Sequence, residues 1–97
     1  MIGQLNTRTK DQDHAVVVDI ILIYDSNDKV TQTELTGRVN ELRDFIRNYF
    51  QTKDHTELAP DNEEKLKQEI IEILNTRYLD TSNILKVVFK KLDVMEL

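Results

Sequence analysis

The sequence predicts an α+β domain of two layers, in which helices pack on one face of a small, mainly antiparallel sheet. Segments rich in β-branched residues lie near both ends of the chain, at residues 14–24 and 84–97. Between them, apolar residues recur every three or four positions in two helical segments, 31–53 and 60–79. A chain of this length can bury one core, so we expect residues 1–97 to form a single domain.

Residues 14–24 are predicted to form the central strand. One of its two alternating sets of side chains is entirely apolar, whereas the other contains Asp19. We therefore expect the helices to cover the unbroken face and Asp19 to mark the more accessible one. The apolar alternation of residues 84–97 changes parity partway along, which predicts a β-bulge at residues 90–91. Weak alternation in residues 2–9 predicts an edge strand.

The first helix is predicted to begin at Thr31, because Thr31 and Glu34 have the spacing of a capping box and Val30 and Leu35 occupy the staple positions around it. Glycine inside a helix costs about 0.5–1 kcal/mol relative to alanine, so Gly37 is either a tolerated surface residue or a site where a neighbouring subunit approaches. We expect the apolar stripe of this long helix to be buried against the central strand. The stripe consists of Leu35, Val39, Leu42, Ile46, Tyr49 and Phe50.

A second helix is predicted to begin near Pro60 or Asp61 and to end near Tyr78 or Leu79. Proline suits the first turn of a helix, and the acidic residues that follow it favour the positive end of the helix dipole. The predicted buried stripe of this helix is Leu66, Ile70, Ile73 and Leu74.

Composition and motifs argue against several functions. A net charge of −5 without a basic cluster disfavours nucleic acid as a partner. The chain has no cysteine, and its two histidines, His14 and His55, lie far apart in the sequence without a second ligand at helical or strand spacing, so no metal or cofactor is predicted. A small hydrolase would need a polar cleft with a titratable pair, and no glycine-rich phosphate loop or nucleophile elbow occurs, so we do not expect an enzyme.

Several dispersed features resemble the flagellar basal-body-associated FliL family. They are the run Leu-Arg-Asp-Phe-Ile at residues 42–46, a leucine shortly before Pro60, the pattern of residues 66–75 and a closing apolar strand at residues 87–89. The resemblance extends over residues 14–94, nearly all of the periplasmic domain of such proteins.

Two departures from the family pattern concern a loop and an edge. Asn62 stands where many members have glycine, and residues 93–96 replace an apolar ending that usually finishes in glutamine. Either change could alter local geometry, and neither undermines the fold.

The resemblance implies a fold likened to the SPFH domain of stomatin and prohibitin. It also implies a non-enzymatic flagellar motor component that associates with and supports the stator units in the periplasm, with effects on torque and motility. Self-association into a ring or partial ring is part of that expectation. Family members carry an N-terminal membrane helix, absent from this chain, so the expected location is the periplasmic side of the inner membrane at the flagellar basal body.

Partner contacts are expected on two surfaces. One is the polar side of the long helix, including Arg38 and Arg43, and the other is the accessible face of the central strand, with Val17, Asp19 and Ile21. The alternative function is a generic α+β cytosolic adaptor or ligand-binding domain, for which an acidic surface is sufficient. An upstream membrane helix in the complete gene product would separate the two.

Overall fold

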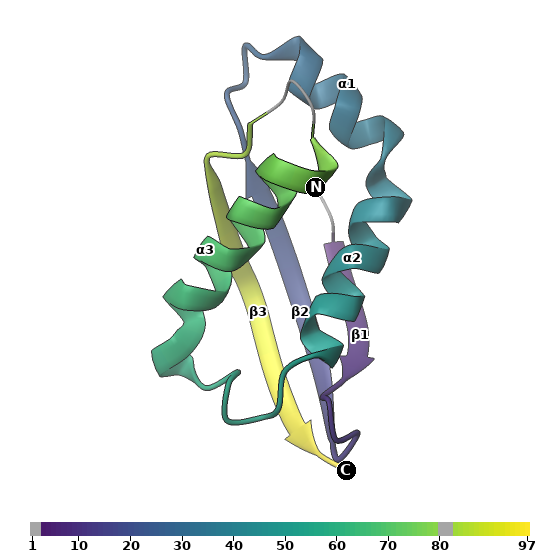
Figure 1. Ribbon diagram of the computed structural model, residues 1–97, viewed down its shortest axis with the longest axis vertical. Coiled ribbons are helices and arrows are strands. Elements are labelled where there is room, and N and C mark those ends of the chain that lie inside the picture. Colours follow the sequence, from purple (N-terminus) through teal and green to yellow (C-terminus); the bar gives the residue numbers. More distant parts are fainter. Residues whose placement is uncertain (1–2, 80–82) are drawn as a thin grey trace.

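The computed structural model describes residues 3–79 and 83–97. In this part of the chain, a three-stranded sheet carries helices on one face (Figure 1). Its strands are β1 (Gly3–Arg8), β2 (His14–Ile23) and β3 (Lys86–Glu96), in the order β1-β2-β3 with both pairings antiparallel. The predicted α+β class, the central strand and the edge strand are confirmed. The likeness to SPFH domains stays a prediction.

The helical layer consists of α1 (Lys29–Gly37), α2 (Val39–Gln51) and α3 (Glu63–Ile73). A 3₁₀ turn, Pro60–Asn62, leads into α3, and a π-helical turn, Leu74–Tyr78, follows it. The predicted limits of the second helix are therefore confirmed.

The first helix begins earlier than its capping box predicts. Asp28 is the N-cap, because its Oδ1 accepts the backbone amide of Thr31 at 3.0 Å and its Oδ2 accepts the Thr31 hydroxyl at 2.6 Å. Thr31 lies inside the helix, which begins at Lys29, so it does not occupy the cap position. Val30 is 59% exposed and forms no staple, and Glu34 pairs with Arg38 at 3.7 Å.

The single long helix predicted at residues 31–53 is in fact two helices. The backbone leaves helical geometry at Arg38, whose φ is −118° and ψ is 16°. The Arg38 amide donates to the carbonyls of both Glu34 and Leu35, so the hydrogen-bond ladder tightens there and α2 begins in a new direction. Gly37 is the last residue of α1, and among residues 3–79 and 83–97 a Cβ at this position would meet no atom within 4 Å beyond its chain neighbours and its own helical turn. Packing against the described part of the chain therefore does not require this glycine.

The core lies between the unbroken face of β2 and the two longer helices. α2 lies against β1 and α3 against β3, so together they cover the central strand (Figure 1). The predicted burial of Leu42, Ile46 and Phe50 from the first stripe is confirmed, and α3 covers the sheet beside α2. Side chains from all layers are fully buried in one cluster: Val16, Val18, Ile20, Leu42, Ile46, Phe50 and Ile70.

The predicted β-bulge is confirmed. Ile20 pairs with Phe89 while Asp19 pairs with Lys91, which leaves Lys90 as the extra residue of β3. This insertion lets both Phe89 and Leu92 face the helices.

Candidate interaction surfaces

Arg38 lies at the junction of α1 and α2 and contacts residues on both sides of it. Its guanidinium donates through Nη1 to the main-chain carbonyl of Tyr78, and Nη2 lies 3.7 Å from Oε2 of Glu34. The side chain is half-buried by these contacts. A role in partner binding stays a prediction, but Arg38 also ties the bend between α1 and α2 to the turn after α3.

Arg43 lies further along α2 and reaches the edge strand. Its Nη2 donates to the main-chain carbonyl of Gln4 at 3.3 Å. Gly3, whose φ is +81°, starts β1 in the left-handed region, and a Cβ there would lie 3.6 Å from Nη1 of Arg43. Arg43 therefore contacts the start of β1, whereas its sequence neighbour Asp44 pairs with Arg47 at 3.0 Å.

The open face of the sheet carries the other three predicted contact residues. Val17, Asp19 and Ile21 are half-buried on the side opposite the helices. Asn6 and Asp93 flank Val17 in the strand register. The helices thus leave uncovered a strip of two apolar side chains with Asp19 between them.

One residue, Gln4, links the two predicted surfaces. Gln4 is the register partner of Asp19, and its carbonyl accepts the hydrogen bond from Arg43. The two surfaces otherwise belong to opposite sides of the sheet. A partner that touches both would have to cross the β1 edge.

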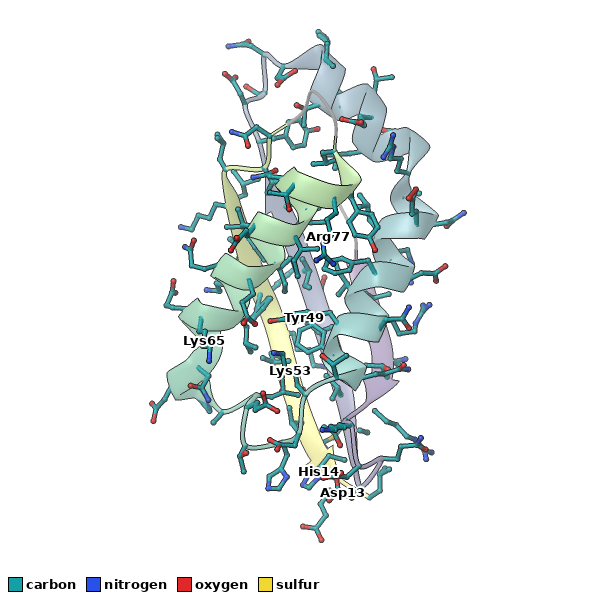
Figure 2. The ribbon with its side chains drawn as sticks, in the orientation of Figure 1. Asp13, His14, Tyr49, Lys53, Lys65 and Arg77 are labelled. Carbon is teal, nitrogen blue, oxygen red and sulfur yellow. The ribbon has the colours of Figure 1, made fainter. Side chains whose placement is uncertain are left out.

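The groove between α2 and α3 was not predicted from the sequence. Its centre is Tyr49, whose hydroxyl donates to Oε1 of Glu69 at 2.5 Å. Nζ of Lys53 lies 3.3 Å from the same carboxylate and 5.2 Å from the centroid of the Tyr49 ring (Figure 2). Phe45 and Tyr78 add aromatic surface, with their ring centroids 4.9 Å apart. The groove is thus lined by aromatic rings and a closed polar triad.

In the triad of Tyr49, Lys53 and Glu69, the pKa shifts of Tyr49 and Glu69 agree on where the proton lies at neutral pH. Burial, followed by the hydrogen bond to Glu69, raises the pKa of Tyr49. The same hydrogen bond, together with Lys53, lowers the pKa of the Glu69 carboxyl. The proton therefore stays on the phenol, and the triad holds two helices together without an activated nucleophile.

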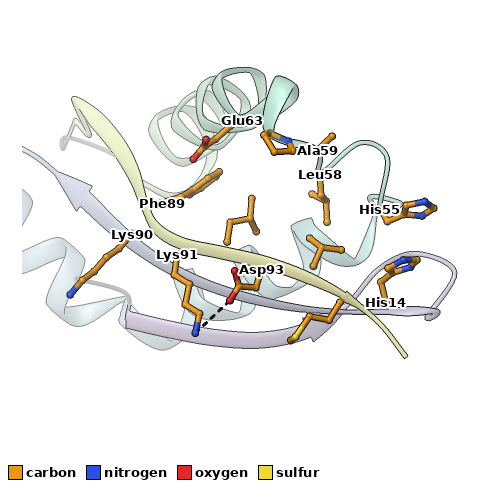
Figure 3. Close-up of a pocket in the computed structure, with 13 residues that line it drawn as sticks. His14, His55, Leu58, Ala59, Glu63, Phe89, Lys90, Lys91 and Asp93 are labelled. Atoms are coloured by element: carbon orange, nitrogen blue, oxygen red, sulfur yellow. Dashed lines mark ion pairs between the residues drawn. The ribbon is translucent and has the colours of Figure 1, made fainter.

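A second groove, of about 570 Å³, runs between β3 and the loop that leads into α3 (Figure 3). Apolar side chains from both elements line it, including Leu58, Phe89 and Leu92. His14 and His55 lie at its end with their rings stacked, the centroids 4.3 Å apart and the planes inclined by 15°.

The histidine pair escaped the sequence analysis. Spacing along the chain indicated no ligand pattern around either histidine, but the fold brings His14 and His55 together beside Asp13. The hydrogen bond with His14 lowers the pKa of Asp13. Only the packing of the 52–59 loop against the β1–β2 hairpin creates this cluster, so no local sequence signal could reveal it.

Among the described residues, no helix combines the length and apolar character that crossing a bilayer requires.

Comparison with known proteins identifies the family. The family model "Flagellar basal body-associated protein FliL" matches residues 1–94. The chain is 41% identical over 96 residues to a protein from Treponema pallidum (strain Nichols) named "Flagellar protein FliL", an alignment that covers 98% of this chain and 53% of that protein. The chain thus spans about half the length of the curated relative it matches. A family match across nearly the whole chain, together with this identity, shows that the chain belongs to the FliL family of flagellar basal body-associated proteins.

Proposed function

We propose that this chain is the periplasmic domain of a FliL protein that supports the stator units of the flagellar motor. The family match over residues 1–94 carries the proposal. In the full-length protein, a membrane helix outside the matched region would hold the domain at the periplasmic side of the inner membrane. The role is mechanical and includes no covalent step.

The open sheet face is the surface best suited to such support. Val17 and Ile21 offer apolar contact area, and Asp19 between them gives the surface a charged centre. Strands β1 and β3 both end the sheet, so outer main-chain groups other than the Gln4 carbonyl, which Arg43 occupies, offer a route to side-by-side association into a ring or partial ring. Such an assembly would hold the stator's periplasmic linker in its active, extended form.

The test changes the open face without disturbing the core. In Val17→Lys, the new ammonium group lies opposite Asp93, which favours the strand pairing. We expect a native circular dichroism spectrum but slower swimming in viscous medium, because the lysine replaces apolar contact area with a charge. Gln68→Lys on the exposed side of α3 is the control, since it adds the same charge away from the sheet and should swim normally.

Arg43→Glu tests the helix surface, with one complication. The substitution removes the hydrogen bond to the Gln4 carbonyl, so β1 pairing must be checked by NMR before a loss of motility is assigned to partner contact.

Unchanged motility of Val17→Lys at normal protein levels would remove the open face from the interface. Unchanged motility after deletion of the whole gene would refute the motor function itself.

A further inference from the structure

We propose that Asp13, His14 and His55 form a binding site for a divalent transition-metal ion of the zinc type. One ligand atom from each of the three side chains lies within 4.8 Å of the others. Two imidazoles and a carboxylate are a ligand set that suits zinc, with remaining positions open to water. This inference is independent of the proposed motor function.

Two of the ligands come from the hairpin that joins β1 to β2. Oδ1 of Asp13 lies 2.9 Å from Nδ1 of His14 and also accepts the hydroxyl of Thr9 at 3.1 Å. Thr9 is almost completely buried, so it anchors the carboxylate to the body of the domain. His14 is itself only 14% exposed and sits at the first position of β2. These two ligands are therefore held in place before any ion binds.

The third ligand is presented by a loop with its own restraints. The Lys10 amide donates to the carbonyl of Lys53 at 2.8 Å, which ties the loop to the hairpin. Oδ1 of Asp54 accepts the hydroxyl of Thr56 at 2.6 Å and the amide of Glu57 at 3.0 Å. His55 lies between these fixed points, with its ring over that of His14 (Figure 3).

The distances require only side-chain movement to close the site. Zinc–nitrogen bonds of 2.0–2.1 Å place the ligand atoms of a tetrahedral ion about 3.3 Å apart. The separation between Asp13 and His14 is already near this value, and exposed His55 can rotate to approach them. A bound ion would replace the hydrogen bond between Asp13 and His14. It would also fasten the 52–59 loop to the hairpin at the end of the β3 groove.

Isothermal titration calorimetry of the tag-free domain with zinc chloride at neutral pH tests the proposal. We expect saturable binding at one site per chain and a zinc-dependent rise in melting temperature, because the ion binds only the folded arrangement. His55→Ala should weaken zinc binding by at least about tenfold, the loss that even an outer-shell partner causes. Its circular dichroism should stay native, since the side chain is exposed.

Glu63→Gln is the matched control, because it removes a carboxylate from the same groove outside the cluster. We expect it to bind zinc as the wild type does. In the wild type, the imidazole NMR signals of both His14 and His55 should shift together on zinc addition. The proposal is overturned by an absence of saturable binding up to millimolar zinc, by unchanged affinity in His55→Ala, or by a shift of only one imidazole.

Discussion

At the scale of single residues, the hydroxyl of Tyr49 joins α2 to α3 through Glu69. Removing it in Tyr49→Phe should lower the free energy of unfolding by about 1–2 kcal/mol, because the buried phenol loses its hydrogen bond to a charged, partly exposed carboxylate. Urea denaturation measures the change. Tyr78→Phe in the same groove is the control. Within residues 3–79 and 83–97 the Tyr78 hydroxyl has no hydrogen-bond partner, so the unfolding free energy of this variant should hardly change.

The same triad predicts a pH dependence. The folded pKa of Tyr49 is raised, so its contribution is complete below the ordinary tyrosine value of 10.0 and is lost as the pH rises above it. The folded pKa of Glu69 is lowered, so its contribution is complete above the ordinary glutamate value of 4.5 and is lost as the pH falls through the folded value. Urea denaturation across the pH range should therefore show that the wild type exceeds Tyr49→Phe in unfolding free energy by less at both pH extremes than at neutral pH. An advantage that is constant with pH would contradict the assigned hydrogen bond.

Ile46 tests the core at its centre. Its side chain is completely buried, so Ile46→Ala should cost about 2–5 kcal/mol of unfolding free energy through lost burial and the cavity left behind. Val30→Ala, at a position 59% exposed on α1, should change stability by less than about 0.5 kcal/mol. Equal denaturant midpoints for Ile46→Ala and the wild type would refute the placement of α2 over the sheet.

At the scale of elements, α1 depends on its N-cap. Asp28 accepts from Thr31, and those hydrogen bonds lower the pKa of the Asp28 carboxyl. The cap should therefore stabilise α1 fully above the ordinary aspartate value of 3.8 and weaken as the pH falls through the lower folded value. Hydrogen exchange should show faster opening of α1 in Asp28→Ala at neutral pH.

Asp28→Asn separates the charge from the cap. Asparagine is also a good N-cap but does not ionise, so α1 protection in this variant should not change in the acidic range. If hydrogen-exchange protection of α1 falls as much in Asp28→Asn as in the wild type when the pH is lowered, another group controls the helix.

The bulge of β3 is a second element-scale feature open to test. Deleting Lys90 should leave Phe89 and Leu92 on the helix face, because the ladder then runs regularly from Ile20 to Asp19. Deleting Asp93 instead would turn Val94 away from the core it packs against. Urea denaturation should therefore show a smaller loss of unfolding free energy for the Lys90 deletion than for the Asp93 deletion. The reverse order would contradict the strand register.

At the scale of the whole molecule, a net charge of −5 opposes association of free copies. The proposed assembly would gain its local concentration from the membrane tether, which raises the effective concentration of neighbouring domains. Sedimentation velocity of the isolated domain should therefore show mostly monomer at micromolar concentration. A stable high-order ring at nanomolar concentration would contradict the dependence on tethering.

The sequence alone determined those features that rest on short-range periodicity. The alternation of β2, the parity change at Lys90 and the helix start at Pro60 each depend on neighbours within a few residues, and all three were predicted correctly. The face of the sheet that the helices cover also followed from a local feature, the interruption of one apolar set by Asp19.

Only the tertiary structure decided the features that join distant segments. Arg38 bends the helix where its guanidinium reaches the carbonyl of Tyr78, and Arg43 turns inward to Gln4, although both look like surface residues in the sequence. The stacking of His14 on His55 likewise exists only because a loop returns to the start of β2. Helical and strand periodicity record which side of an element faces the core, but not which other element lies there, so these contacts required the folded chain.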